Sequence, residues 1–76
     1  MLIQILGTGC PKCNKLEEIT RKVAEEMKIE YRIEKVSDLN EILRFGVMMT
    51  PALVVNGIVK SSGRIPENED LKKMLL

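Results

Sequence analysis

The fold is decided by the stretch LIQILGTGCPKC, which runs from Leu2 to Cys13. Its first five residues, 2–6, are nearly all apolar, and such a run is typical of a short strand buried on both faces. A Gly-Thr-Gly turn follows. Pro11 suits the first position of a helix, because the N–H that proline lacks would have no partner there. The stretch therefore predicts a strand that turns directly into a helix, with two cysteines at the helix start.

Hydrophobic periodicity extends this pattern through the first half of the chain. Apolar residues recur at steps of three and four over about 11–28, which predicts a helix. Apolar and polar residues then alternate over 29–34, which predicts a strand with one wet face at an edge of the sheet. Ser37 and Asp38 can cap a short helix that Gly46 ends.

The second half predicts a hairpin and a last helix. The apolar residues 52–55 read as a strand, and Asn56-Gly57 is a two-residue hairpin signal because both turn positions require a positive φ. Residues 58–60 return as the partner strand, and Gly63 ends the pattern. A helix is predicted over 66–76, with acids early and lysines late, in the order that suits the helix dipole.

The element order is therefore βαβαββα, an α/β fold. The first β-α-β unit should be a right-handed parallel crossover. The apolar first strand should be central, and the closing hairpin should extend the sheet on its other side. We expect a four-stranded mixed sheet of order 2-1-3-4 with helices on both faces. A chain of 76 residues should form one domain, 1–76, with a small core.

Composition excludes several function classes. The chain has 12 basic and 11 acidic residues, two aromatic residues and no histidine. Near-neutral charge with so few rings argues against nucleic-acid binding, and the missing histidine excludes Ser-His-Asp and Cys-His catalysis. No apolar run approaches the length of a membrane span, and the apolar start is too short for a secretory signal. Two cysteines three residues apart are no disulfide scaffold, so we expect a cytoplasmic protein.

The chemistry is concentrated at Cys10 and Cys13. Cys10 is expected at the helix N-cap, where unsatisfied N–H groups and the helix dipole favour an anion. Together with Lys12 and the adjoining Pro11, this setting is expected to lower the pKa of Cys10. Cys13, one turn on, should be more buried and close enough to form a disulfide. The alternative for Lys12 is a solvated lysine without effect on Cys10.

These motifs together resemble the thioredoxin superfamily, above all its short redox-active disulfide members. The residues that carry the resemblance are the C-P-K-C segment after a strand, Thr50-Pro51, the Asn56-Gly57 hairpin and Gly63. The resemblance implies a thiol-disulfide oxidoreductase in which Cys10 is the nucleophile and Cys13 resolves the mixed disulfide. It also implies a cis bond at Pro51 beside the cysteines, and substrate pairing with the backbone of Thr50. From the dipeptide alone, an ordinary trans bond is the more frequent case.

Departures from the family pattern bear on partners. The family's carboxylate six residues before the first cysteine is replaced by Gln4, which cannot accept a proton from Cys13. The segment 61–64 only half matches the glutathione-binding segment of glutaredoxins. We therefore expect disulfide-containing protein substrates, a thioredoxin-reductase-type electron donor rather than glutathione, no cofactor, and a monomer.

Two other function classes use the same cysteines. The loop before Cys10 is similar to that of copper-carrying domains, and two thiolates suit Cu(I), although Thr8 stands where those domains have methionine. A cluster-binding or interaction protein on the same scaffold is the other class, and an Fe–S cluster would have to be shared across a dimer. For Met48-Met49, we expect packing in the core or at its rim rather than substrate contact.

Overall fold

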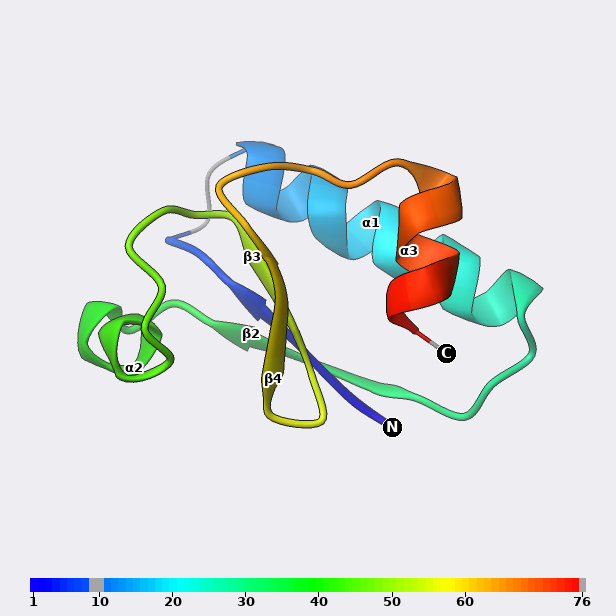
Figure 1. Ribbon diagram of the computed structural model, residues 1–76, viewed down its shortest axis with the longest axis horizontal. Helices are drawn as coiled ribbons and strands as arrows, with labels where there is room; N and C mark the ends of the chain where they lie inside the picture. Colours follow the sequence, from blue (N-terminus) through cyan, green and yellow to red (C-terminus); the bar gives the residue numbers. More distant parts are fainter. Residues whose placement is uncertain (9–10, 76) are drawn as a thin grey trace.

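The computed structural model describes residues 1–8 and 11–75 (Figure 1), so Gly9, Cys10 and Leu76 lie outside the described residues. The elements follow the order βαβαββα that the sequence predicts. They are β1 (Leu2–Leu6), α1 (Pro11–Glu26), β2 (Arg32–Val36), α2 (Leu39–Arg44), β3 (Ala52–Val55), β4 (Ile58–Ser62) and α3 (Asn68–Met74).

The strands form one four-stranded sheet of order β2-β1-β3-β4, which confirms the predicted order. β1 pairs parallel with β2 and antiparallel with β3, and β4 pairs antiparallel with β3. In this register Leu6 lies opposite Val36 on one side and Ala52 on the other. The residues that follow β1 and β2 and those that precede β3 therefore meet at the same end of the sheet.

Helices cover both faces of the sheet, as predicted. Figure 1 shows α1 and α3 together on one side and α2 apart from them. The core under α1 and α3 contains alternate residues of β1 and β3, among them Ile3, Ile5 and Leu53. The smaller core, between the sheet and α2, contains residues of β1 and β3 whose side chains point to the other face of the sheet, such as Leu6 and Val54. A central strand with both faces covered is favoured by apolar residues, which explains why β1 is apolar except at Gln4.

The second strand lies further along the chain than its alternation predicts. The predicted range 29–34 is replaced by Arg32–Val36, because the partner strand begins only at Leu2 and the ladder opens where Arg32 N–H donates to Met1 O at 2.9 Å. Ile29 and Tyr31 nonetheless pack against the core under α1. The alternation of apolar and polar residues over 29–31 is therefore explained by packing of one side of this segment on the core, and not by pairing with β1.

The helix ends also differ from the prediction. α1 ends at Glu26 rather than near residue 28, and α3 begins at Asn68 rather than at Pro66. Pro66 is buried and precedes the N-cap Glu67, whose carbonyl accepts the first helical bond, from Leu71 N. Among residues 1–8 and 11–75, no helix has both the length and the apolar character needed to cross a bilayer.

The predicted caps and hairpin turn are confirmed. Asp38 is the N-cap of α2, and its side chain accepts from Asn40 N. Gly46 follows α2 with φ 79°. Asn56 and Gly57 adopt φ of 51° and 84°, as a two-residue hairpin turn requires.

Candidate active site

Cys13 lies in the first turn of α1 and is 5% exposed. It begins a series of buried α1 residues that continues with Leu16, Thr20 and Val23, at the spacing of one helix face. The sulfur is therefore turned toward the sheet by the same periodicity that places the core of α1. Its proposed partner Cys10 falls outside the described residues.

A cavity of about 110 Å³ adjoins Cys13 at this end of the sheet. Its lining comes from three segments, β1 with the residue after it, the start of α1, and β2 with the residue after it. The lining residues are Ile5, Gly7, Cys13, Asn14, Lys35 and Ser37. The parallel pairing of β1 with β2 brings these segments together, because the carboxyl ends of neighbouring parallel strands lie at one edge.

The Thr50–Pro51 peptide bond is cis, as the family resemblance implies. Pro51 is buried, whereas Thr50 is exposed. The loop is fixed to the end of β4 by a hydrogen bond from Gly63 N–H to Pro51 O at 2.9 Å. A Cβ placed on Gly7 would lie 3.9 Å from Thr50 Cβ and much closer to Cys13. Cys13 and Thr50 therefore both approach the point at which a side chain on Gly7 would begin.

Pro11 and Lys12 are both exposed in the first turn of α1. Lys12 therefore lies at the same end of α1 as Cys13, with its side chain in solvent. An exposed cation acts on nearby groups only weakly, since water and salt screen its charge.

Met48 and Met49 do not lie in the core, so that half of the expectation is wrong for both residues, whereas the rim packing that it also allowed is seen for Met49. Met48 is 91% exposed and Met49 is 66% exposed. Met49 does contact the rim of the fold, since a Cβ on Gly63 would lie 3.0 Å from Met49 Cβ. The chain becomes buried again only at Pro51, and residues shortly before it, Met48 and Met49, remain on the surface.

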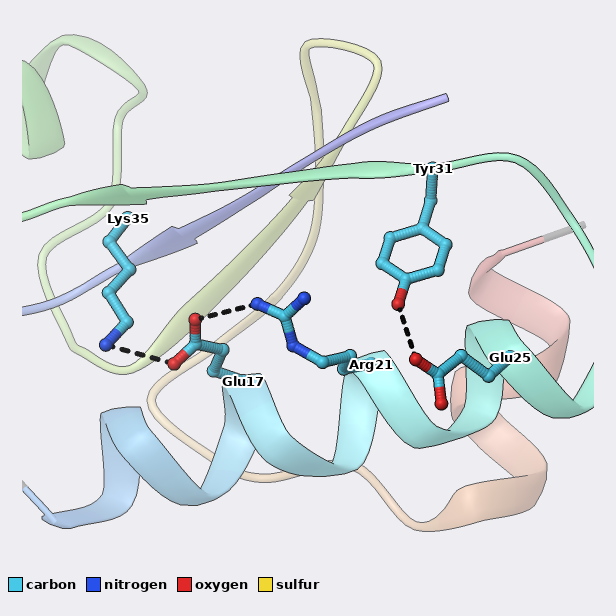
Figure 2. Close-up of polar contacts among 5 residues, drawn as sticks. All are labelled: Glu17, Arg21, Glu25, Tyr31 and Lys35. Carbon is cyan, nitrogen blue, oxygen red and sulfur yellow. Dashed lines mark hydrogen bonds and ion pairs between the residues drawn. The ribbon is translucent and has the colours of Figure 1, made fainter.

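A charged bridge joins α1 to β2 beside the Cys13 cavity (Figure 2). Lys35 Nζ lies 3.0 Å from Glu17 Oε1, and Arg21 lies 3.4 Å from Glu17 Oε2. The Glu17 side chain is only 20% exposed, so its carboxylate is held between two cations. Glu17 is four residues after Cys13, one turn further along α1, and Lys35 also lines the cavity.

Sequence reasoning missed Lys35. A signal was available, because Lys35 lies near the carboxyl end of β2, and the sequence predicts that β1, which precedes the cysteines, runs parallel to β2. The carboxyl ends of parallel strands lie at the same edge of a sheet. Tyr31 makes a second link between the same two segments, because its hydroxyl donates to Glu25 at 3.1 Å.

Gln4 lies on the other face of the sheet from Cys13. It lines a separate pocket under α2, with Glu34, Glu41 and Arg44 among its neighbours. Side chains alternate along a strand, so Ile5 faces the Cys13 cavity and residue 4 faces away. A carboxylate at position 4 would therefore not face Cys13 in this chain, whichever acid stood there.

The chain matches known proteins along its whole length. A family model described as the thioredoxin domain matches residues 1–76. A protein named thioredoxin from Methanothermobacter thermautotrophicus is 40% identical over 75 residues, covering 99% of this chain and 97% of its own. One of the same name from Methanocaldococcus jannaschii is 41% identical over 75 residues, covering 99% and 86%. A probable thioredoxin from Archaeoglobus fulgidus is 33% identical over 69 residues, covering 87% and 75%.

Proposed function

The chain belongs to the thioredoxin domain family and is a thiol-disulfide oxidoreductase, and from this premise we propose that Cys10 and Cys13 are its redox couple. The observation that carries the proposal is the place of Cys13, buried in the first turn of α1 beside the cis-proline loop. A buried thiol is sheltered from outside disulfides, and a second cysteine three residues earlier in the sequence is the partner proposed for it. This is the arrangement that a resolving cysteine needs.

The proposed reaction has two exchange steps. The Cys10 thiolate attacks one sulfur of a substrate disulfide, and a substrate thiolate leaves as the mixed disulfide forms. Cys13 then loses its proton to water and attacks the Cys10 sulfur, which releases the second substrate thiolate. The substrate has gained two electrons, and the protein holds a Cys10–Cys13 disulfide. A reductase returns two electrons to complete the cycle.

Thr50 and Pro51 are proposed to hold the substrate. The support is that Thr50 is exposed and that its Cβ lies 3.9 Å from the Cβ position of Gly7, which Cys13 also contacts. An extended substrate segment could pair with the backbone of Thr50 and present its disulfide to Cys10. Pro11 and Lys12, exposed at the helix start, are proposed to favour the Cys10 thiolate, mainly through the dipole of the helix that Pro11 begins and to a smaller extent through the screened charge of Lys12.

The proposed partners follow from family membership. Disulfide-containing proteins are the proposed substrates, and a reductase of the thioredoxin-reductase type is the proposed electron donor. We place the protein in the cytoplasm, where reductants keep such a couple cycling. We also propose that residues 1–76 form a single domain that acts as a monomer.

A redox titration of the metal-free protein tests the couple. Thiols are alkylated at a series of buffer potentials, and the mass counts the modified cysteines. We expect one reversible two-electron transition that involves both cysteines. Cys10→Ser should abolish disulfide reduction, whereas Cys13→Ala should trap a mixed disulfide that mass spectrometry detects. A Cys10→Ser variant with full activity would contradict the assignment.

The copper-carrier alternative is an outcome of the same experiment. The copper-carrying domains that the loop resembles have two strands after the first helix and end on a strand. Here α2 follows β2 and α3 closes the described chain, so the element order favours the redox function. If no internal disulfide forms and both thiols become protected only when Cu(I) is added back, the proposed redox couple is refuted and the carrier function replaces it.

A further inference from the structure

Position 7 requires glycine because a side chain there would have no room, and not because the backbone adopts a conformation that only glycine tolerates. Gly46, Gly57 and Gly63 adopt positive φ, a region that favours glycine, and Gly7 does not. A Cβ built on Gly7 would overlap Cys13 Sγ and would lie 3.1 Å from Cys13 Cβ. The Cβ of any other residue at position 7 would therefore occupy the volume that holds the Cys13 sulfur.

The backbone on both sides of this contact is held in place. Gly7 N–H donates to Val36 O at 2.9 Å, which continues the parallel ladder one residue beyond β1. Gly7 itself is buried. On the other side, Cys13 is fixed by the buried face of α1, where Leu16 is 0% exposed. The strand end and the helix cannot easily separate, so a methyl group at position 7 would be relieved mainly by displacement of the Cys13 sulfur.

We propose that Gly7 is the positioning residue of the resolving step: its missing side chain lets Cys13 Sγ lie where it can attack the mixed disulfide on Cys10. This inference rests on the proposed function. Thiol-disulfide exchange needs the attacking sulfur aligned with the bond it breaks, and a misplacement of about 1 Å can slow a reaction on the order of 100-fold. The contact thus controls the second exchange step.

The first exchange step should be spared. A methyl group on Gly7 would lie 3.9 Å from Thr50 Cβ, which is ordinary van der Waals contact and requires no movement of the substrate-binding loop. Gly7→Ala should therefore leave attack on the substrate disulfide within about threefold of wild type. Resolution should slow by at least tenfold, and the mixed disulfide should accumulate. A residue that acted only on stability would not separate the two rates in this way.

The experiment mixes reduced protein with a labelled peptide disulfide, quenches with acid, and follows the mixed disulfide by mass. Gly46→Ala is the matched control. Gly46 has φ 79° and no atom within 4 Å of an added Cβ, so alanine there strains the backbone without approaching Cys13. We expect Gly46→Ala to be destabilised and to resolve at the wild-type rate. If Gly7→Ala also resolves at the wild-type rate, the inference is overturned.

A second measurement covers the case in which Gly7→Ala does not fold. The double variant Gly7→Ala/Cys13→Gly lacks both atoms that the methyl group would approach too closely, Cys13 Sγ and Cys13 Cβ, so it should fold and unfold near the urea midpoint of Cys13→Gly alone. If the double variant also fails to fold, position 7 does not reserve space for the sulfur and the inference is wrong. If the wild-type protein neither reduces the peptide disulfide nor forms a mixed disulfide with it, the proposed function itself has failed.

Discussion

Substitution of Asn56 by alanine should destabilise the fold through two separable effects. Asn56 adopts φ 51°, and this left-handed conformation costs an alanine about 1 kcal/mol more than it costs asparagine or glycine. The asparagine side chain also reaches β1, because Oδ1 accepts from Leu2 N–H at 2.9 Å. A hydrogen bond of this kind contributes about 0.5–1.5 kcal/mol net. Together they predict a loss of about 1.5–2.5 kcal/mol.

This loss is large for a chain of this size. A protein of 76 residues has a free energy of unfolding of about 4–11 kcal/mol. The midpoint of thermal unfolding should fall by roughly 10 °C. The bond from Asn56 N–H to Leu2 O, at 2.8 Å, involves only backbone atoms and survives the substitution. The turn should therefore loosen without detaching from β1.

Urea unfolding of the reduced protein, followed by far-ultraviolet circular dichroism, measures the loss. Asn56→Asp keeps both the oxygen acceptor and the tolerance for positive φ, so it should be close to wild type. Asn56→Gly keeps the conformation and loses the oxygen, so it should fall between aspartate and alanine. An Asn56→Ala variant within about 0.5 kcal/mol of wild type would refute the reasoning, because both effects would then be negligible.

Three further predictions concern the core, the α2 cap and the Cys13 cavity. Leu53→Ala, at a position that is 0% exposed, should cost about 2–5 kcal/mol by urea unfolding, and an unchanged midpoint would contradict the assigned core. Asp38→Ala should cost about 1 kcal/mol because Asn40 N–H loses its acceptor, which an Asp38→Asn control should largely preserve. Lys35→Met should slow alkylation of Cys13 at neutral pH, since it removes an ammonium that lines the cavity and leaves the nearby Glu17 carboxylate with one cation fewer, and both changes disfavour the thiolate. Lys60→Met on exposed β4 should leave the rate unchanged, and equal rates for the two variants would remove Lys35 from the site.

Local signals in the sequence were sufficient for most of the fold. The apolar run of β1, the three-and-four spacing of α1 and the Asn56-Gly57 turn each depend on a few neighbouring residues, and all three predictions are confirmed. The boundaries of β2 and α3 were less accurate. A ladder begins where its partner strand begins, and no local pattern around residues 29–34 records the start of β1 at Leu2.

The residues of the candidate site also differ in whether the sequence alone could predict their place. Cys13 and the Thr50-Pro51 bond could be singled out from motifs, and the structure brings Cys13 and Thr50 close to Gly7. Cys10 lies outside the described residues, so its role remains a proposal. The face that Gln4 occupies could not be predicted, because distance along the sequence from the cysteines does not reveal on which side of the sheet a side chain lies.

The sequence by itself determined the order of elements, the central place of β1 and the candidate redox cysteines, because hydrophobic period, turn residues and short motifs act over a few positions. Tertiary structure alone decided that Gly7 leaves room for the Cys13 sulfur, and that Lys35 and Glu17 meet beside it. These contacts join β1, α1 and β2 through a parallel crossover. Their geometry depends on the register between strands 30 residues apart, as in the pairing of Leu2 with Arg32, and no local pattern encodes it.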